Sequence, residues 1–206
     1  VLLLSPLLEA FRDCFPPGVV NTVYGDGSTV VGPLMQSGKV DCLDFIGSSR
    51  VADSLKQQHP KPHRLRSVLG LGAKNPAIIL PDAELELTVN ECLLGSLSFN
   101  GQRCTALKII FVHEKIADDF LKRFVAAVDG LQPGLPWEAG VKITRLPVPG
   151  KPQQMADWIA DACEKGARVL NQGGGLVHGT YCHPAVVYPV APDSELYEHE
   201  QFGPVV

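Results

Sequence analysis

The fold of this chain is decided around one stretch, Ser98-Phe99-Asn100-Gly101-Gln102-Arg103-Cys104-Thr105-Ala106. The apolar spacing of residues 84–97 before it predicts a helix, and the β-branched and aromatic residues of 107–113 after it predict a buried strand. Cys104 therefore lies where two core elements meet, beside an arginine. A cysteine attacks as the thiolate, which nearby cations and backbone amides favour. Chemistry alone leaves two alternatives open for Cys104, a reactive nucleophile and an inert buried thiol of the kind indicated by the apolar run around Cys92.

Strand-like and helix-like segments alternate outward from this stretch, which predicts an α/β fold with a parallel sheet. We expect further helices at residues 3–14, 29–36, 48–57, 114–131 and 151–166. We expect further strands at residues 19–24, 40–45, 64–71, 76–80, 168–170 and 184–190. A proline-rich loop at 133–152 is too long to be a simple connector.

Three smaller features carry specific structural predictions. We expect Asp82 to cap the helix at residues 84–97. The segment Gly25-Asp26-Gly27 lacks the spacing of a dinucleotide-binding fingerprint, and we expect a hairpin-type turn there. The apolar spacing of the helix at 151–166 places Cys163 on its inner face.

Composition narrows the class of protein. At 206 residues, of which 45% are hydrophobic, the chain can bury a sizeable core in one large domain or two small ones. A net charge of −4 with dispersed Lys and Arg argues against nucleic acid as a partner. The six cysteines show no CxxC pair and no zinc-ligand spacing, so we expect no metal and a reducing compartment. The apolar start lacks the features of a signal peptide or a membrane span, which favours a cytoplasmic protein without membrane contact.

Four motifs, in sequence order, resemble those of the aldehyde dehydrogenase superfamily. Phe45-Ile46-Gly47-Ser48 is similar to the family's cofactor turn, and Leu69-Gly70-Leu71-Gly72-Ala73-Lys74 is similar to its Leu-Glu-Leu-Gly-Gly-Lys segment. Residues 99–106 are similar to its nucleophile motif, and Glu200-Gln201-Phe202-Gly203-Pro204 is similar to its cofactor clamp. The Gln-Arg-Cys-Thr form looks most like the NADP-dependent, non-phosphorylating glyceraldehyde-3-phosphate dehydrogenase branch.

The resemblance implies an aldehyde-dehydrogenase-like α/β fold. Residues 1–70 are then the C-terminal part of a Rossmann-type dinucleotide-binding domain, and residues 71–206 are a truncated α/β catalytic domain. Members of the family are substantially longer at both ends, so we expect this chain to be a fragment whose isolated activity is doubtful. The family also forms homo-oligomers, which we expect of the full-length protein.

For the chemistry, the resemblance implies that Cys104 attacks an aldehyde to give a thiohemiacetal, with its own backbone amide stabilising the oxyanion. Hydride transfer to the nicotinamide then gives a thioester, which water hydrolyses. Arg103 and Thr105 are expected to contact the substrate, with Arg103 holding a phosphate through charge-assisted hydrogen bonds. The family's second oxyanion donor is an asparagine upstream of this chain, and Asn100 is not at its position.

For the cofactor, Gly47 and Ser48 follow a predicted strand and open a predicted helix. The residues alone favour an ordinary capped helix there, although such a turn also suits a phosphate. The resemblance implies that this turn and Leu71 contact NADP, or NAD. It also implies that Glu200 hydrogen-bonds the nicotinamide ribose and that Phe202 packs against the ring.

The chain departs from the family at Gly70, where the glutamate that activates water usually stands, and glycine cannot act as a base. Three explanations stay open. Another carboxylate, Glu200 or Glu91, activates water; a different acceptor such as coenzyme A resolves the thioester; or the chain is a non-catalytic scaffold with the same fold. The motifs favour the first. We therefore expect NAD(P)-dependent oxidation of an aldehyde, with glyceraldehyde 3-phosphate going to 3-phosphoglycerate.

Overall fold

The computed structural model describes residues 4–206, and the chain divides into two compact units between Leu71 and Gly72. We describe each unit by itself. The division falls one residue from the boundary expected from the motifs, and the assignment of the two units to cofactor binding and catalysis stays a prediction.

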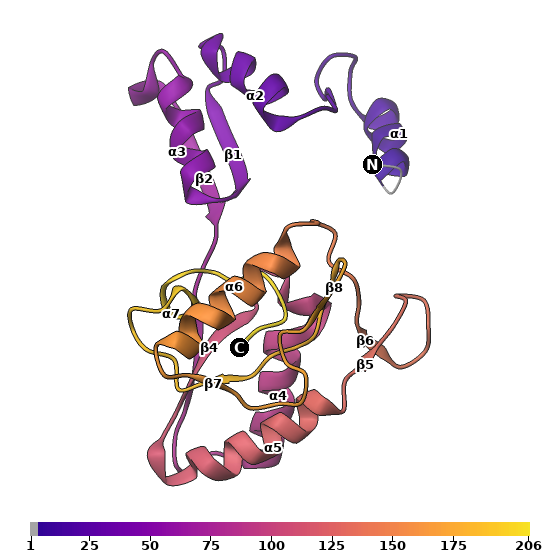
Figure 1. Ribbon diagram of the computed structural model, residues 1–206. Helices are drawn as coiled ribbons and strands as arrows, with labels where there is room; N and C mark the ends of the chain where they lie inside the picture. Colours follow the sequence, from indigo (N-terminus) through magenta and orange to yellow (C-terminus); the bar gives the residue numbers. More distant parts are fainter. Residues whose placement is uncertain (1–3) are drawn as a thin grey trace. The chain divides into compact units, whose positions relative to one another are not determined.

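The first unit, from residue 4 onward, contains one pair of parallel strands, with two α-helices before the first strand and one α-helix between the two (Figure 1). Its elements are α1 (Ser5–Cys14), α2 (Gly27–Gln36), β1 (Cys42–Gly47), α3 (Ser49–Gln58), the 3₁₀ turn η2 (Pro62–Arg64) and β2 (Arg66–Leu71). A small core of Met35, Leu43 and Leu55 joins α2, β1 and α3. The expected strands and helices of this unit are thus confirmed from residue 27 onward.

The N-terminal part of this unit corrects two predictions. The strand expected at 19–24 is wrong: the segment is irregular, and Val19, Val20, Val23 and Tyr24 are exposed. Its β-branched residues suit a strand, but a strand also needs a hydrogen-bonded neighbour, and within residues 4–71 only β1 and β2 pair. The turn expected at 25–27 is also wrong. The side chain of Asp26 accepts from Ser28 N at 2.9 Å and caps α2 instead.

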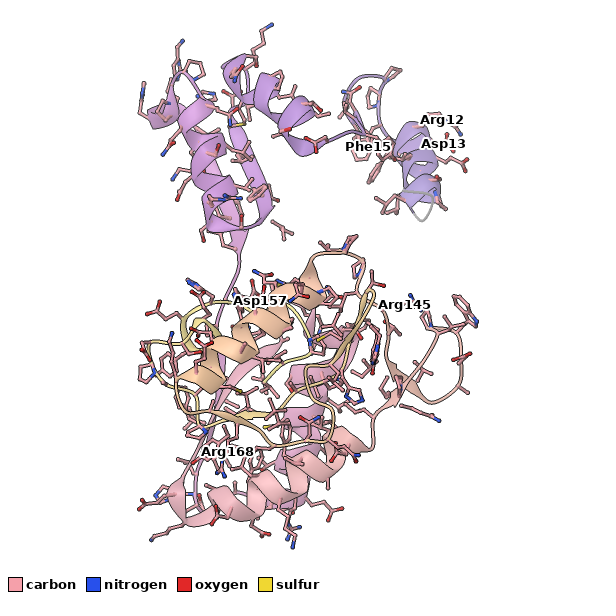
Figure 2. The ribbon with its side chains drawn as sticks, viewed as in Figure 1. Arg12, Asp13, Phe15, Arg145, Asp157 and Arg168 are labelled. Carbon is pink, nitrogen blue, oxygen red and sulfur yellow. The ribbon has the colours of Figure 1, made fainter. Side chains whose placement is uncertain are left out.

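Helix α1 shows how little this part of the chain is packed. None of its residues is buried, and its Arg12 and Asp13 pair with each other on the surface, 2.9 Å apart (Figure 2). Such an exposed pair adds little to stability.

The second unit holds several short parallel and antiparallel strand pairs between helices. Its first half contains β3 (Asn75–Ile79), α4 (Leu85–Leu97), η3 (Ser98–Gly101), β4 (Leu107–Val112), η4 (Glu114–Ile116), α5 (Ala117–Asp129), β5 (Gln132–Pro133) and β6 (Val141–Ile143). Its second half contains α6 (Lys151–Glu164), β7 (Arg168–Val169), β8 (Val177–His178), β9 (Tyr181–Cys182), β10 (Val187–Tyr188) and α7 (Glu195–Glu198). The parallel pairs are β3 with β4 and β5 with β6; β7 with β10 and β8 with β9 are antiparallel.

The core beside the nucleophile stretch is formed by α4, α5 and β3. Helices α4 and α5 pack against each other (Figure 1), and Phe120 and Phe124 of α5 stack with ring centroids 5.4 Å apart. Cys92 of α4 is buried in this cluster, as the apolar run around it predicts. The expected cap at Asp82 is wrong, because the Glu84 carboxylate accepts from Glu86 N and Leu87 N and so caps α4.

A second cluster packs the inner face of α6 against the C-terminal segments. Met155, Ile159 and Ala162 lie in it with Val187 and Val205. Cys163 is exposed, which contradicts its expected inner position. Because a helix turns about 100° per residue, a residue that directly follows the buried Ala162 points away from the inner stripe. Among residues 4–206, no helix has the length and apolar character needed to cross a membrane.

Candidate active site

Cys104 lies at the surface on a tight turn between η3 and β4. Ala106 N donates to Arg103 O at 3.1 Å, which closes the turn with Cys104 and Thr105 at its two central positions. The Asn75 side chain donates from Nδ2 to the carbonyls of Cys104 and Ala106, at 2.6 and 3.0 Å. The turn therefore exposes both Cys104 and Thr105, while its backbone is held from β3.

The contrast with the buried thiols is chemical as well as geometric. Burial raises the pKa of Cys92 to about 11 and that of Cys182 to about 11, so both stay protonated near neutral pH. A protonated thiol is a poor nucleophile. Of the three, only Cys104 is exposed, which fits the nucleophile alternative and not the buried one.

The loop before the turn has an unusual backbone. Phe99, Asn100 and Gly101 have φ of 53°, 58° and 68°, all in the left-handed region that non-glycine residues adopt at a cost. Asn100 is anchored on both sides of its amide: Nδ2 donates to Thr144 Oγ1 at 3.0 Å, and Oδ1 accepts from Thr144 N at 2.8 Å. The surroundings therefore impose this loop conformation.

Gly101 is required at its position for a second reason. A Cβ there would lie 2.5 Å from the carbonyl oxygen of Gly203 and 2.8 Å from that of Ser96. The loop at residues 98–103, which we call the nucleophile loop after the motif it belongs to, thus packs directly on the backbone of the Glu200–Pro204 motif. That motif is about a hundred residues later in the chain.

Arg103 is turned back onto helix α4. One guanidinium nitrogen donates to the carbonyls of Leu94 and Gly95, at 3.2 and 3.1 Å, and the guanidinium lies over the Phe99 ring at 5.8 Å. Its Nε is buried without a hydrogen-bond partner among the described residues. Arg103 therefore neutralises the C-terminal end of α4, and its expected contact with substrate stays a prediction.

Glu200 and Phe202 lie together around the ammonium of Lys108, a residue of β4. Lys108 Nζ is 3.9 Å from Glu200 Oε1 and 5.2 Å from the centroid of the Phe202 ring. The backbone of Gly72 also lies close to the carboxylate, so close that a Cβ on Gly72 would collide with Glu200 Oε2. The clamp residues Glu200 and Phe202 and the end of the Leu69–Lys74 motif, at Gly72, therefore lie next to each other around Lys108.

Two buried side chains fix the clamp segment. Gln201 Nε2 donates to the carbonyls of Lys108 and Val205, at 2.8 and 2.7 Å. Lys74 Nζ donates to the carbonyls of Leu196 and His199 and to Gln201 Oε1, at 2.6 to 2.9 Å. Burial lowers the pKa of Lys74 to about 8, with Lys108 lowering it further and Glu200 opposing the shift.

The remaining motif residues lie in the first unit. Gly47 ends β1 and is the register partner of Leu71 in β2. Ser48 caps α3, and its side chain accepts from Val51 N at 3.4 Å. Gly70 is exposed on β2 as the partner of Ile46. The first amides of α3 are thus available at a helix start, the arrangement that suits a phosphate group.

One polar atom of the second unit fits the ribose of a nicotinamide dinucleotide. Glu200 Oε1 is a buried carboxylate oxygen that has no hydrogen-bond partner within residues 4–206. An orphaned acceptor of this kind is satisfied by a ligand that brings hydroxyl donors, as a ribose does. In the described part of the chain, no group of three or more His, Cys, Asp and Glu side chains is arranged to hold a metal ion.

Sequence reasoning missed Lys108, Asn75 and the structural role of Gln201. Gln201 is only 1% exposed and Lys108 3% exposed, although both are polar. A signal for Lys108 was present, since it is the one charged residue in the otherwise apolar strand 107–112. Asn75 reaches Cys104, 29 residues away, and Gln201 reaches Lys108, 93 residues away, and no local pattern reveals these contacts.

Comparison with known proteins gives a consistent result. The model of the Aldehyde dehydrogenase family matches residues 2–206. Salicylaldehyde dehydrogenase of Pseudomonas putida is 32% identical over 194 residues, which cover 92% of this chain and 40% of that protein. The NADP-dependent glyceraldehyde-3-phosphate dehydrogenase of Streptococcus equinus is 34% identical over 204 residues, covering 97% of this chain and 41% of that protein.

Solved structures agree with this. Succinate-semialdehyde dehydrogenase from Burkholderia pseudomallei superposes with a TM-score of 0.89 at 31% identity, covering 97% of this chain and 41% of that one. NADP-dependent glyceraldehyde-3-phosphate dehydrogenase from Bacillus halodurans, complexed with NADP, gives a TM-score of 0.88 at 32% identity, covering 98% and 41%. The chain thus spans about two fifths of the length of the relatives it matches.

Proposed function

This chain belongs to the aldehyde dehydrogenase family, and we propose that it carries the nucleophile of an enzyme that oxidises an aldehyde to a carboxylic acid with NAD or NADP. The observation that carries the proposal is the exposed Cys104 at the centre of a turn held by Asn75, within the family's nucleophile motif.

Cys104 and its turn account for the first chemical steps. The Cys104 sulfur adds to the aldehyde carbon, and the carbonyl oxygen becomes the oxyanion of a thiohemiacetal. Cys104 N donates to no backbone carbonyl within residues 4–206, so it is free to hydrogen-bond that oxyanion. A nicotinamide, when bound, would accept the hydride from the thiohemiacetal carbon, and Cys104 would then carry the acyl group as a thioester.

Residues of each unit support cofactor binding separately. In the first unit, the turn at Gly47 and Ser48 with Leu71 beside it offers free amides for the pyrophosphate. In the second unit, Glu200 offers a carboxylate oxygen for the nicotinamide ribose and Phe202 offers an aromatic face. A carboxylate oxygen that accepts no hydrogen bond is the feature that a ribose hydroxyl would satisfy.

For the substrate, we favour glyceraldehyde 3-phosphate, with NADP as the cofactor and 3-phosphoglycerate as the product. Two observations support this choice: the Gln-Arg-Cys-Thr form of the motif, and relatives in sequence and structure that carry that name. Relatives named for other aldehydes are similar to the chain to the same degree. Overall similarity therefore does not select the substrate, and our choice rests on Arg103 and Thr105 of the motif.

Gly70 favours a second candidate. It lies on β2 where a glutamate base is expected, and it offers no group to activate water. Glu200 is the carboxylate beside the nucleophile loop, whereas Glu91 is exposed on α4. If Glu200 does not activate water, the thioester is resolved by a thiol such as coenzyme A.

The full-length protein tests both candidates. We expect it to reduce NADP, or NAD, when an aldehyde is added. Cys104→Ser should lower turnover by at least about a thousandfold, because the hydroxyl is a much weaker nucleophile, while cofactor affinity stays within about twofold.

The same assay with and without coenzyme A separates hydrolysis from acyl transfer. Turnover that needs coenzyme A selects the second candidate. A Cys104→Ser protein that keeps most of the activity contradicts the assignment of the nucleophile.

A further inference from the structure

Lys108 is a buried charge that the chemistry above does not use. It extends from β4 into the interior with its side chain only 1% exposed. A lysine is almost never buried to this degree unless its ammonium has partners. The identity of those partners therefore indicates what Lys108 is for.

The partners of Lys108 belong to the two functional segments of the second unit. Its Nζ donates to the carbonyl of Gly101, at 2.7 Å, in the loop that leads into Cys104. The same ammonium is 3.9 Å from Glu200 Oε1 and lies over the Phe202 ring at 5.2 Å. One cation thus contacts both the nucleophile loop and the clamp segment.

The contact with Glu200 matters because its carboxylate has few other polar neighbours. Glu200 Oε1 is buried and has no hydrogen-bond partner among residues 4–206, and Lys108 is its nearest cation. A neutral residue at 108 would leave this oxygen and the Gly101 carbonyl without compensation, which costs free energy in a buried site.

We propose that Lys108 is a positioning residue that contacts two segments at once. It holds the nucleophile loop through Gly101 and the cofactor clamp through Glu200 and Phe202, and so fixes the position of each segment relative to the other. The inference rests on the proposed function, in which Glu200 and Phe202 contact the cofactor. Lys108 itself touches neither substrate nor cofactor.

The charges that face Lys108 fit this role. Burial lowers the pKa of Lys108 to about 8; Glu200 and Cys104 raise it, and Lys151 and Arg103 lower it. Lys74 lies close by, since its Nζ donates to Gln201 Oε1 at 2.7 Å; its pKa is lowered mainly by burial and further by Lys108, and Glu200 opposes the shift. The Glu200 carboxylate therefore helps to keep the ammonium charged at neutral pH despite its burial.

The test uses the full-length protein with four variants: Lys108→Met, Lys108→Arg, Glu200→Gln and the double variant Lys108→Met/Glu200→Gln. Lys122→Met, an exposed lysine on α5, is the matched control. Two quantities are measured: the affinity for NADP and NAD by fluorescence titration, and the rate of Cys104 alkylation by iodoacetamide, read by peptide mass spectrometry.

We expect Lys108→Met to weaken cofactor binding by about tenfold and to slow Cys104 alkylation several-fold. The reason is that methionine cannot replace the contacts of the ammonium with Glu200 and with the Gly101 carbonyl. Lys108→Arg should restore most of the cofactor affinity, since it keeps the charge. Glu200→Gln should weaken binding little further once Lys108 is Met. Lys122→Met should change neither quantity.

Three results overturn the proposal: a Lys108→Met protein that matches Lys122→Met in both quantities, effects of the two substitutions that simply add, or an arginine that restores nothing. If Lys108→Met does not fold, the Arg variant decides, since loss of cofactor affinity there despite the retained charge contradicts the proposal. A wild type that binds neither cofactor contradicts the proposed function instead, and the alkylation rates still decide the role of Lys108.

Discussion

The region around Cys104 and the turn at Gly47–Ser48 both carry family motifs, yet they are held in different ways. The Cys104 region is fixed by side chains remote in sequence, including Asn75, 29 residues away, and Gln201, which reaches back 93 residues to Lys108. The Gly47–Ser48 turn is fixed by regular backbone structure, through the strand pair β1–β2 and the start of α3, which Ser48 caps. Buried side-chain hydrogen bonds hold one region, and regular secondary structure holds the other.

The difference teaches where a substitution should matter. In the Cys104 region, one change disturbs several buried contacts at once, because the loop and the clamp are packed backbone to backbone. In the first unit the core is small, and most of the N-terminal residues are exposed. Changes there should have local and smaller effects.

The largest effect is expected for Gly101→Ala. Its φ of 68° disfavours alanine, and a Cβ would lie 2.5 Å from Gly203 O. We expect the free energy of unfolding of the second unit to fall by about 3 kcal/mol and turnover to fall about a hundredfold. Urea unfolding and steady-state kinetics of the full-length protein measure these two quantities.

Gly27→Ala is the matched control for this prediction. Gly27 starts α2 and has no atom within 4 Å of an added Cβ, so stability should change by less than about 0.5 kcal/mol. Equal losses at the two glycines would remove the contrast between the regions.

A smaller effect is expected for Arg103→Leu. If Arg103 binds a substrate phosphate, the KM for a phosphorylated aldehyde should rise by about tenfold more than the KM for an unphosphorylated one, because one charge-assisted contact is lost. The alternative is that Arg103 serves only the α4 carbonyls of Leu94 and Gly95. In that case both KM values change together, and the phosphate-binding role is wrong.

The smallest effect is expected for Ser48→Ala. Loss of the cap should lower the stability of the first unit by about 1 kcal/mol, and NADP affinity should fall only a few-fold because backbone amides remain. Calorimetry and fluorescence titration measure the two changes. An unchanged affinity would argue that this turn does not contact the cofactor.

Much of the fold followed from local sequence patterns. The helix and the strand on either side of the Cys104 turn are confirmed, as are β1, β3 and the buried face of α5. The strands are apolar runs and α5 has strong apolar periodicity, so propensity and burial agree there. The buried state of Cys92 followed from the same reasoning.

The failures have physical causes. Residues 19–24 have strand-forming side chains but no neighbour to pair with, and Glu84 displaced Asp82 as the cap because it lies directly before α4. The left-handed Phe99 and Asn100 could not be predicted, since their conformation is imposed by Thr144, some 44 residues later. The roles of Lys108 and Gln201 depend on packing that no local pattern encodes.

The most direct test of the central claim is to find the acyl group. The full-length protein is mixed with NADP and an aldehyde, quenched in acid and mapped by peptide mass spectrometry. Acid stops hydrolysis whichever group activates water, so the thioester present at the moment of quenching should be trapped. We predict an acylated peptide that contains Cys104 and its absence in Cys104→Ser. Steady turnover with Cys104 unmodified, or acylation at another cysteine, would contradict the account.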